Sequence, residues 1–137
     1  MGLLYNMLML ESTLNFVNFV MLTFMTTFSM ELYFSESYGS MSEDEKFKMG
    51  ILSKAMGIKF LVVSSMACTA APVATNGIKQ VTLINFIVNG LFCAWCLSGP
   101  AQKAGMDMNA LYFWTGYYTI AFLVGMMAPV DGKKKGE

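Results

Sequence analysis

The chain contains no histidine and no arginine, and all nine of its basic residues are lysine. Without histidine, the commonest metal and haem ligand and the usual general base near neutral pH are missing. Without arginine, no side chain can bind a carboxylate or a phosphate through two parallel hydrogen bonds. Many enzyme classes are excluded by these absences, so we expect a protein that is not an enzyme and that carries no cofactor and no metal.

Charge is also scarce. Charged residues make up 13% of the chain and hydrophobic residues 55%, whereas soluble domains contain about 25% charged residues. The net charge is zero and no dense basic patch occurs before the C-terminal tail, so we expect no nucleic-acid partner. The 137 residues allow one domain, 1–137, in which four apolar segments of roughly 20 residues use most of the chain. The composition predicts an all-α membrane protein, a bundle of four transmembrane helices with short loops.

Turn and capping residues divide the chain into these four spans. Glu11–Thr13 is typical of a helix start, Ser42 and Glu45 form a capping box, and Asp107 is a candidate N-cap. The short link at Thr75–Gly77 predicts that the second and third spans pack as antiparallel neighbours. The expected spans are 14–34, 51–72, 78–98 and 108–128.

A polar stripe follows one face of the third span, and Asn15 and Asn18 form a similar face on the first. An unpaired amide in hydrocarbon costs several kcal/mol, so both faces should turn toward protein. There the side chains either hydrogen-bond neighbouring helices or line a small polar cavity. A proton path would need a carboxylate in the stripe, and the third span has none. The stripe, with spacings of 3, 4, 4 and 3, is Thr82, Asn85, Asn89, Cys93 and Cys96.

Four charged residues fall in or near the first two spans: Glu11, Glu31, Lys54 and Lys59. If the bilayer begins near Met49, Lys59 lies about 15 Å deep. If it begins near Lys59, the first span slides toward the N-terminus and Glu11 enters the membrane. Charges inside a membrane are candidates for function, and the alternative is that they extend to the interface.

Cys93 and Cys96 form a Cys-x-x-Cys pair inside the third span. The pattern resembles the membrane-embedded pair of the vitamin K epoxide reductase family, which is also a small helical bundle. The resemblance implies a thiol–disulfide oxidoreductase. That family has a second cysteine pair in a loop, whereas this chain has only Cys68 besides these two. The alternative is that the cysteines are small packing residues.

The C-terminus carries Lys134 and Lys135 at the fourth and third positions from the end. This tail resembles the dilysine retrieval signal of the eukaryotic endoplasmic reticulum, and the alternative is a basic topology anchor. Four spans place both termini on one side, and the lysine distribution favours the cytoplasmic side. We expect an integral membrane protein of the endoplasmic reticulum if the tail is such a signal, and otherwise of an organelle or inner membrane.

Three functions remain open from these patterns. The first is a non-catalytic accessory or structural subunit, whose partners are the lipid bilayer and other membrane subunits. The second is an intramembrane oxidoreductase that uses Cys93 and Cys96. The third is a small carrier or channel lined by Asn85 and Asn89.

Overall fold

A computed structural model describes residues 2–73 and 75–130 of the chain. Those residues form helices and short connections, with no strand, so the prediction of an all-α chain is confirmed. Four helices are long and apolar enough to cross a membrane, namely α1, α3 with its short extension η1, α4 and α6. The segments are α1 (Leu3–Phe24), α2 (Thr26–Ser40), α3 (Glu43–Ala70), η1 (Ala71–Val73), α4 (Asn76–Leu97), α5 (Pro100–Lys103) and α6 (Met108–Met127).

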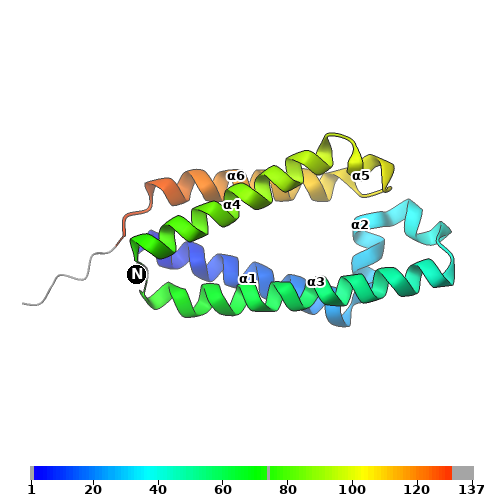
Figure 1. The fold of residues 1–137 in the computed structure, drawn as a ribbon, viewed down its shortest axis with the longest axis horizontal. Helices are drawn as coiled ribbons and strands as arrows, with labels where there is room; N and C mark the ends of the chain where they lie inside the picture. Colours follow the sequence, from blue (N-terminus) through cyan, green and yellow to red (C-terminus); the bar gives the residue numbers. More distant parts are fainter. Residues whose placement is uncertain (1, 74, 131–137) are drawn as a thin grey trace, which may run out of the picture.

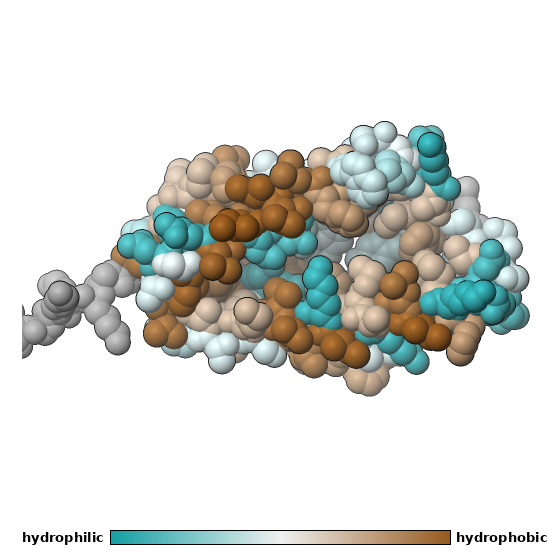
Figure 2. All heavy atoms as spheres, viewed as in Figure 1, coloured by the Kyte–Doolittle hydropathy of each residue, from teal (hydrophilic) through white to brown (hydrophobic). Residues whose placement is uncertain are grey.

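The four long helices form two antiparallel pairs, α1 with α3 and α4 with α6 (Figure 1). The pairs lie close together at the end that carries the start of α1, and α2 lies between them at the other end (Figure 1). The expectation that the second and third spans pack as neighbours is wrong, because α3 packs mainly on α1 and α4 on α6. Figure 2 shows apolar side chains over the outer faces of both pairs and hydrophilic ones in the hollow between α3 and α4.

Small hydroxyl residues hold the α1–α3 pair together. The Ser12 hydroxyl donates to the Ser64 carbonyl at 2.9 Å, and the Ser64 hydroxyl donates to the Ser12 carbonyl at 2.8 Å. Further along, the Ser53 hydroxyl donates to the Leu22 carbonyl at 2.9 Å. Such short side chains let two helix backbones approach closely, and they satisfy their own polar atoms across the contact.

Glycine and aromatic residues hold the α4–α6 pair together. A Cβ placed on Gly125 would lie 2.8 Å from Leu83 Cδ2, so a larger residue at this position would require the Leu83 side chain to shift. Phe86, which is 1% exposed, packs its ring against those of Tyr117 and Tyr118, with centroids 6.4 and 6.3 Å apart. This packing brings the polar face of α4 to the interior side of α6.

Local capping signals define where α3 and α6 begin. The predicted capping box is confirmed, because Ser42 and Glu45 exchange both of its hydrogen bonds. The predicted N-cap Asp107 is also confirmed, since its carboxylate accepts from the backbone N–H groups of Asn109 and Ala110 at 2.7 and 3.2 Å. Such caps satisfy N–H groups that the first turn leaves unpaired.

The first span differs from the prediction of 14–34. The apolar helix α1 begins at Leu3 and continues through Glu11, and the backbone leaves helical geometry at Met25, with φ −116° and ψ 43°. Next to this break, the Thr26 hydroxyl donates back to the Leu22 carbonyl at 3.1 Å, a contact that often bends helices. The residues after the break form the separate helix α2. The register with Glu11 inside the apolar helix is therefore the one observed.

Candidate functional site

A single carboxylate lies buried at the contact between the two helix pairs. Glu11 on α1 is 4% exposed. Its Oε2 accepts a hydrogen bond from the Tyr117 hydroxyl of α6 at 2.6 Å, and its Oε1 accepts from the Asn85 amide of α4 at 3.4 Å. One carboxylate thus joins α1 to both helices of the other pair.

The Glu11 carboxylate accepts from neutral donors. In the described part of the chain, the ion pairs are Lys46 with Glu43 and Lys48 with Asp44, both in the first turns of α3. A buried carboxylate that is held by an amide and a phenol can bind a proton, because the Tyr117 oxygen can then accept from the acid. Among the described residues, the side chains that donate to the Glu11 carboxylate are therefore one amide and one phenol.

The polar stripe of α4 extends this contact along the helix. The Asn89 amide donates to the Asn85 side-chain oxygen at 2.9 Å and to the Asn85 carbonyl at 2.7 Å. Since the Asn85 amide donates in turn to Glu11, the three side chains form one hydrogen-bonded row. Thr82, the first member of the stripe, instead donates to its own helix, at the Ile78 carbonyl.

The row lies near the middle of the candidate spans. Glu11 is about 12 Å from the start of α1 at 1.5 Å per residue. Asn85 and Tyr117 stand at similar depths in α4 (Asn76–Leu97) and α6 (Met108–Met127). Each of the three helices therefore contributes one polar side chain to the same level, about halfway along the bundle.

Two hollows lie on either side of this row along the bundle. A groove of about 320 Å³ between α1, α3 and α4, which we call the Glu11 groove, contains Leu8 and Glu11 of α1 and reaches from Gly77 to Asn85 on α4. A cavity of about 240 Å³, which we call the inner cavity, contains Asn18 of α1 and Asn89 of α4. Along both α1 and α4, the residues that line the groove and those that line the cavity meet at the hydrogen-bonded row.

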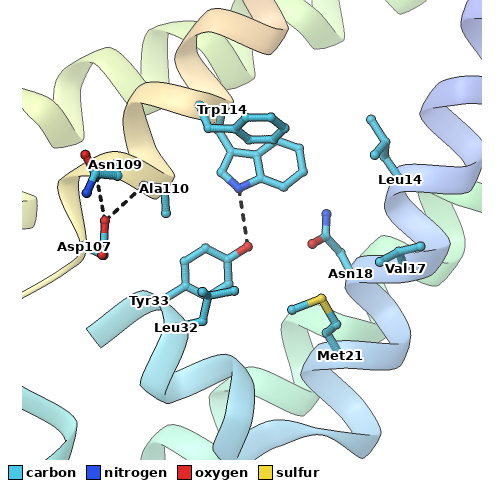
Figure 3. A pocket seen from close by; sticks show the side chains of 11 residues that line it. Leu14, Val17, Asn18, Met21, Leu32, Tyr33, Asp107, Asn109, Ala110 and Trp114 are labelled. Atoms are coloured by element: carbon cyan, nitrogen blue, oxygen red, sulfur yellow. Dashed lines mark hydrogen bonds between the residues drawn. The ribbon is translucent and has the colours of Figure 1, made fainter. Parts of the chain in front are cut away.

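The contact of Tyr33 with Trp114 forms one wall of the inner cavity. Trp114 Nε1 donates to the Tyr33 hydroxyl oxygen at 3.4 Å, and burial raises the pKa of Tyr33. Asn18 lies beside this pair, and the three side chains, from α1, α2 and α6, turn toward one another (Figure 3). The same three residues also line a pocket of about 360 Å³ between α1, α2 and the start of α6, so the Tyr33–Trp114 contact lies between that pocket and the inner cavity.

The other charged candidates lie outside this row. Glu31, Lys54 and Lys59 are exposed, and Glu11 alone of the four is buried. Lys59 also lines the inner cavity. Since Ser53 lies level with Leu22 near the end of α1, Lys59 stands about 9 Å further along α3, inside the candidate span.

The two asparagines predicted on the first span, Asn15 and Asn18, are both buried. The Asn15 amide donates to the Glu11 carbonyl of its own helix at 2.7 Å. Asn18 faces the inner cavity. They thus lie on the same side of α1 as Glu11, one and two turns along.

The two cysteines of the third span are buried in separate apolar clusters. Cys93 packs with Phe86 and Tyr118, whereas Cys96 packs with Ala101 and Leu111. Both are free thiols in the described chain, as is the exposed Cys68. Lys134 and Lys135 lie outside the described residues.

The residue that sequence reasoning missed is Tyr117. It falls in an aromatic run at the start of the last span, which is typical of the membrane interface, and its hydroxyl instead reaches Glu11 in the interior. Comparisons with protein-family models, with curated proteins and with solved structures find no match for this chain. The site is therefore interpreted from its own geometry.

Proposed function

We propose that this chain is an integral membrane protein in which α1, α3, α4 and α6 cross the bilayer. The support is their length and apolar composition and the position of their charges. α6 has no charged residue, and α1 and α4 have one each, Glu11 and Lys79. Glu11 is buried, and the Lys79 ammonium donates to the carbonyls of Met126 and Ala128 at the end of α6, where a cation is favoured.

Within that membrane protein, the proposed activity is that of a small carrier whose Glu11 binds and releases a proton halfway across the bilayer. One observation carries this proposal. The hydrogen-bonded row of Glu11, Asn85 and Asn89 stands between the Glu11 groove and the inner cavity. The third span lacks the carboxylate that a proton path needs, and α1 supplies it.

The chemistry requires no residue type that the chain lacks. A proton taken up from one hollow resides on a Glu11 oxygen, where it neutralises a charge that is costly in hydrocarbon. Tyr117 and Asn85 hold the carboxyl group in place in both states. Release into the opposite hollow requires the Glu11 carboxyl group to turn from one hollow toward the other.

Proton flux into liposomes that contain the purified protein tests this proposal. We expect Glu11→Gln to reduce the flux driven by a pH gradient to that of empty liposomes, since the amide cannot carry a proton. Asn89→Leu should reduce it by about tenfold, and Lys59→Met should change it if the inner cavity is the entry path. Glu31→Gln and Lys54→Met are matched controls at exposed positions and should retain full flux. Wild-type flux in the Glu11→Gln variant would overturn the carrier proposal.

A second candidate is a non-catalytic accessory or structural subunit of a larger membrane complex. The observation that favours it is the limited contact between the two pairs, which leaves the facing sides of α3 and α4 mostly without a neighbour. A native gel of membranes solubilised in mild detergent tests this function. Migration within a large assembly would support it, and migration as a small free protein would count against it.

A further inference from the structure

The Glu11 groove is walled by apolar side chains and ends at one buried carboxylate. Along α3 it is lined by Val63, Met66, Ala67 and Ala70, and along α4 by Gly77, Ile78, Val81 and Thr82. Small residues, Ala67, Ala70 and Gly77, keep it open, and its volume is about 320 Å³.

Charge complementarity identifies what such a groove can hold. A carboxylate in an apolar setting is stabilised strongly by a cation beside it, because little water screens the pair. In the described chain Glu11 is met by the neutral donors Asn85 and Tyr117. The apolar walls in turn suit a hydrocarbon chain, because binding removes the apolar surface of the chain from water.

We propose that the Glu11 groove binds an organic ammonium ion with a hydrocarbon chain, and that this cation and the proton compete for the Glu11 carboxylate. The proposal rests on the function proposed above, in which Glu11 is the proton-binding group, and it names the second substrate of the same site. In the exchange, the O–H bond of the Glu11 acid breaks and the proton passes to water in the groove. The ammonium ion then takes its place beside the carboxylate, with the hydrocarbon chain along α3 and α4.

Glu11 is the one residue of this site that is expected to release a proton when the cation binds. Among the described residues, the titratable side chains near Glu11 are Tyr117 and Tyr118 of α6. The neighbouring side chains of α4 and α3, such as Asn85 and Ala67, do not titrate. Binding should therefore release at most one proton, and it should strengthen by about tenfold for each pH unit over the range in which the acid form predominates.

Calorimetric titration of the purified full chain in lipid nanodiscs tests the exchange. The probe is decyltrimethylammonium, which has a permanent charge and no proton of its own. Titration in two buffers of different ionisation enthalpy then counts the protons that the protein releases. We expect close to one proton released below the pH of half-exchange, and no saturable binding of decanol, which has the same chain and no charge.

Three variants separate the parts of this proposal. Glu11→Gln should abolish proton release and weaken binding at least tenfold, whereas Glu31→Gln should retain both. Ala70→Leu fills the groove and keeps the carboxylate, so it should weaken binding about tenfold, while about one proton is still released for each probe molecule bound. This variant keeps the test informative if Glu11→Gln does not fold. Absence of saturable binding, binding without proton release, or unchanged affinity in Ala70→Leu would each overturn the proposal.

The outcomes also distinguish this inference from the carrier function. Binding coupled to proton release together with no proton flux would support the exchange site and overturn the carrier. Proton flux that depends on Glu11 together with no binding of the ammonium probe would support the carrier and overturn the exchange site.

Discussion

The contacts within each helix pair differ in kind from the contact between the pairs. Inside the α1–α3 pair, hydroxyls of Ser12 and Ser64 reach the opposite backbone at 2.8–2.9 Å, and inside the α4–α6 pair Gly125 lies directly against Leu83. Between the pairs, the Glu11 carboxylate accepts from the Tyr117 hydroxyl at 2.6 Å and from the Asn85 amide at 3.4 Å. Hollows flank this second contact on both sides.

The difference separates the residues that hold the structure from those that can act. Small residues give dense packing that resists rearrangement. The net contribution of a buried carboxylate with neutral partners is small, because its desolvation opposes the gain from its hydrogen bonds. Removal of one partner is nevertheless costly, because it leaves the buried charge less well paired. The contact between the pairs is thus where the proposed proton exchange would take place.

The largest effect should come from overfilling the contact inside a pair. A Cβ on Gly57 of α3 would collide with the Thr23 hydroxyl of α1 and lie 3.5 Å from the Phe19 carbonyl oxygen. We expect Gly57→Leu to lower the free energy of unfolding by about 3 kcal/mol, at the upper end for overpacking. Equilibrium unfolding in mixed micelles with increasing dodecyl sulfate measures it.

Gly50 provides the matched control for that variant. A Cβ there has Thr26 Cγ2 at 4.0 Å as its nearest neighbour. Gly50→Leu gains the same helix propensity, up to about 1 kcal/mol, without a collision, so it should be neutral or stabilising. Equal stability of the two variants would show that the α1–α3 contact is looser than described.

A smaller effect is expected at the contact between the pairs. Tyr117→Phe removes the hydroxyl that donates to Glu11 at 2.6 Å. Hydrogen bonds to charged groups contribute about 1.5–3 kcal/mol in water-soluble proteins, whereas those between membrane helices average about 0.6 kcal/mol. We expect a loss of about 1.5 kcal/mol in the same unfolding measurement, because the partner is a buried carboxylate.

Two further variants isolate this interaction. Tyr112 is 61% exposed, so Tyr112→Phe should leave stability unchanged. In the double variant with Glu11→Gln, the loss from Tyr117→Phe should fall to about half, because the acceptor is then neutral. A loss from Tyr117→Phe that is independent of residue 11 would mean that its ring, and not its hydroxyl, carries the effect.

Local signals made three of the four long helices predictable from the sequence. Ser42 and Glu45 define the start of α3, and Asp107 defines that of α6, because each cap is formed by residues that are neighbours in the chain. The start of α1 was missed because Glu11 interrupts an apolar run. A charged residue in such a run is typical of the end of a membrane span unless its hydrogen-bond partners are known. The partners of Glu11 are 74 and 106 residues away.

The candidate site was also predictable only in part from the sequence. The spacing of Asn85 and Asn89 identified the interior face of α4, since helical periodicity is a property of the sequence alone. Tyr117 was not identified, because aromatic residues at the interface and in the interior have the same local pattern. The pairing of α1 with α3 also depends on where Ser12 meets Ser64, which no local rule fixes.

Within the α1–α3 pair, removal of one hydroxyl should lower the free energy of unfolding less than removal of the Tyr117 hydroxyl does. Ser64→Ala deletes the bond to the Ser12 carbonyl and leaves the Ser12 hydroxyl donating to the backbone at position 64. We expect a loss of about 1 kcal/mol in the unfolding measurement. The control is Ser65→Ala, since Ser65 is exposed and donates to the Leu61 carbonyl of its own helix. A larger loss at Ser65 would contradict this account of the pair.

The smallest effect should arise where α2 links the two pairs. Tyr33→Phe removes the acceptor of the Trp114 N–H at 3.4 Å, a long hydrogen bond that contributes about 0.5 kcal/mol. The Tyr33 carbonyl still accepts from the Asp107 N–H at 2.7 Å, so α2 should stay in place. The sensitive readout is Trp114 fluorescence in a Trp95→Phe background, where we expect a red shift as the indole N–H turns toward water. A red shift with unchanged stability would mark this wall of the inner cavity as a movable part of the loose contact. A loss of 2 kcal/mol or more in the free energy of unfolding would instead show that α2 stabilises the contact between the two pairs. The contact at Glu11 would then be the one loose contact between them.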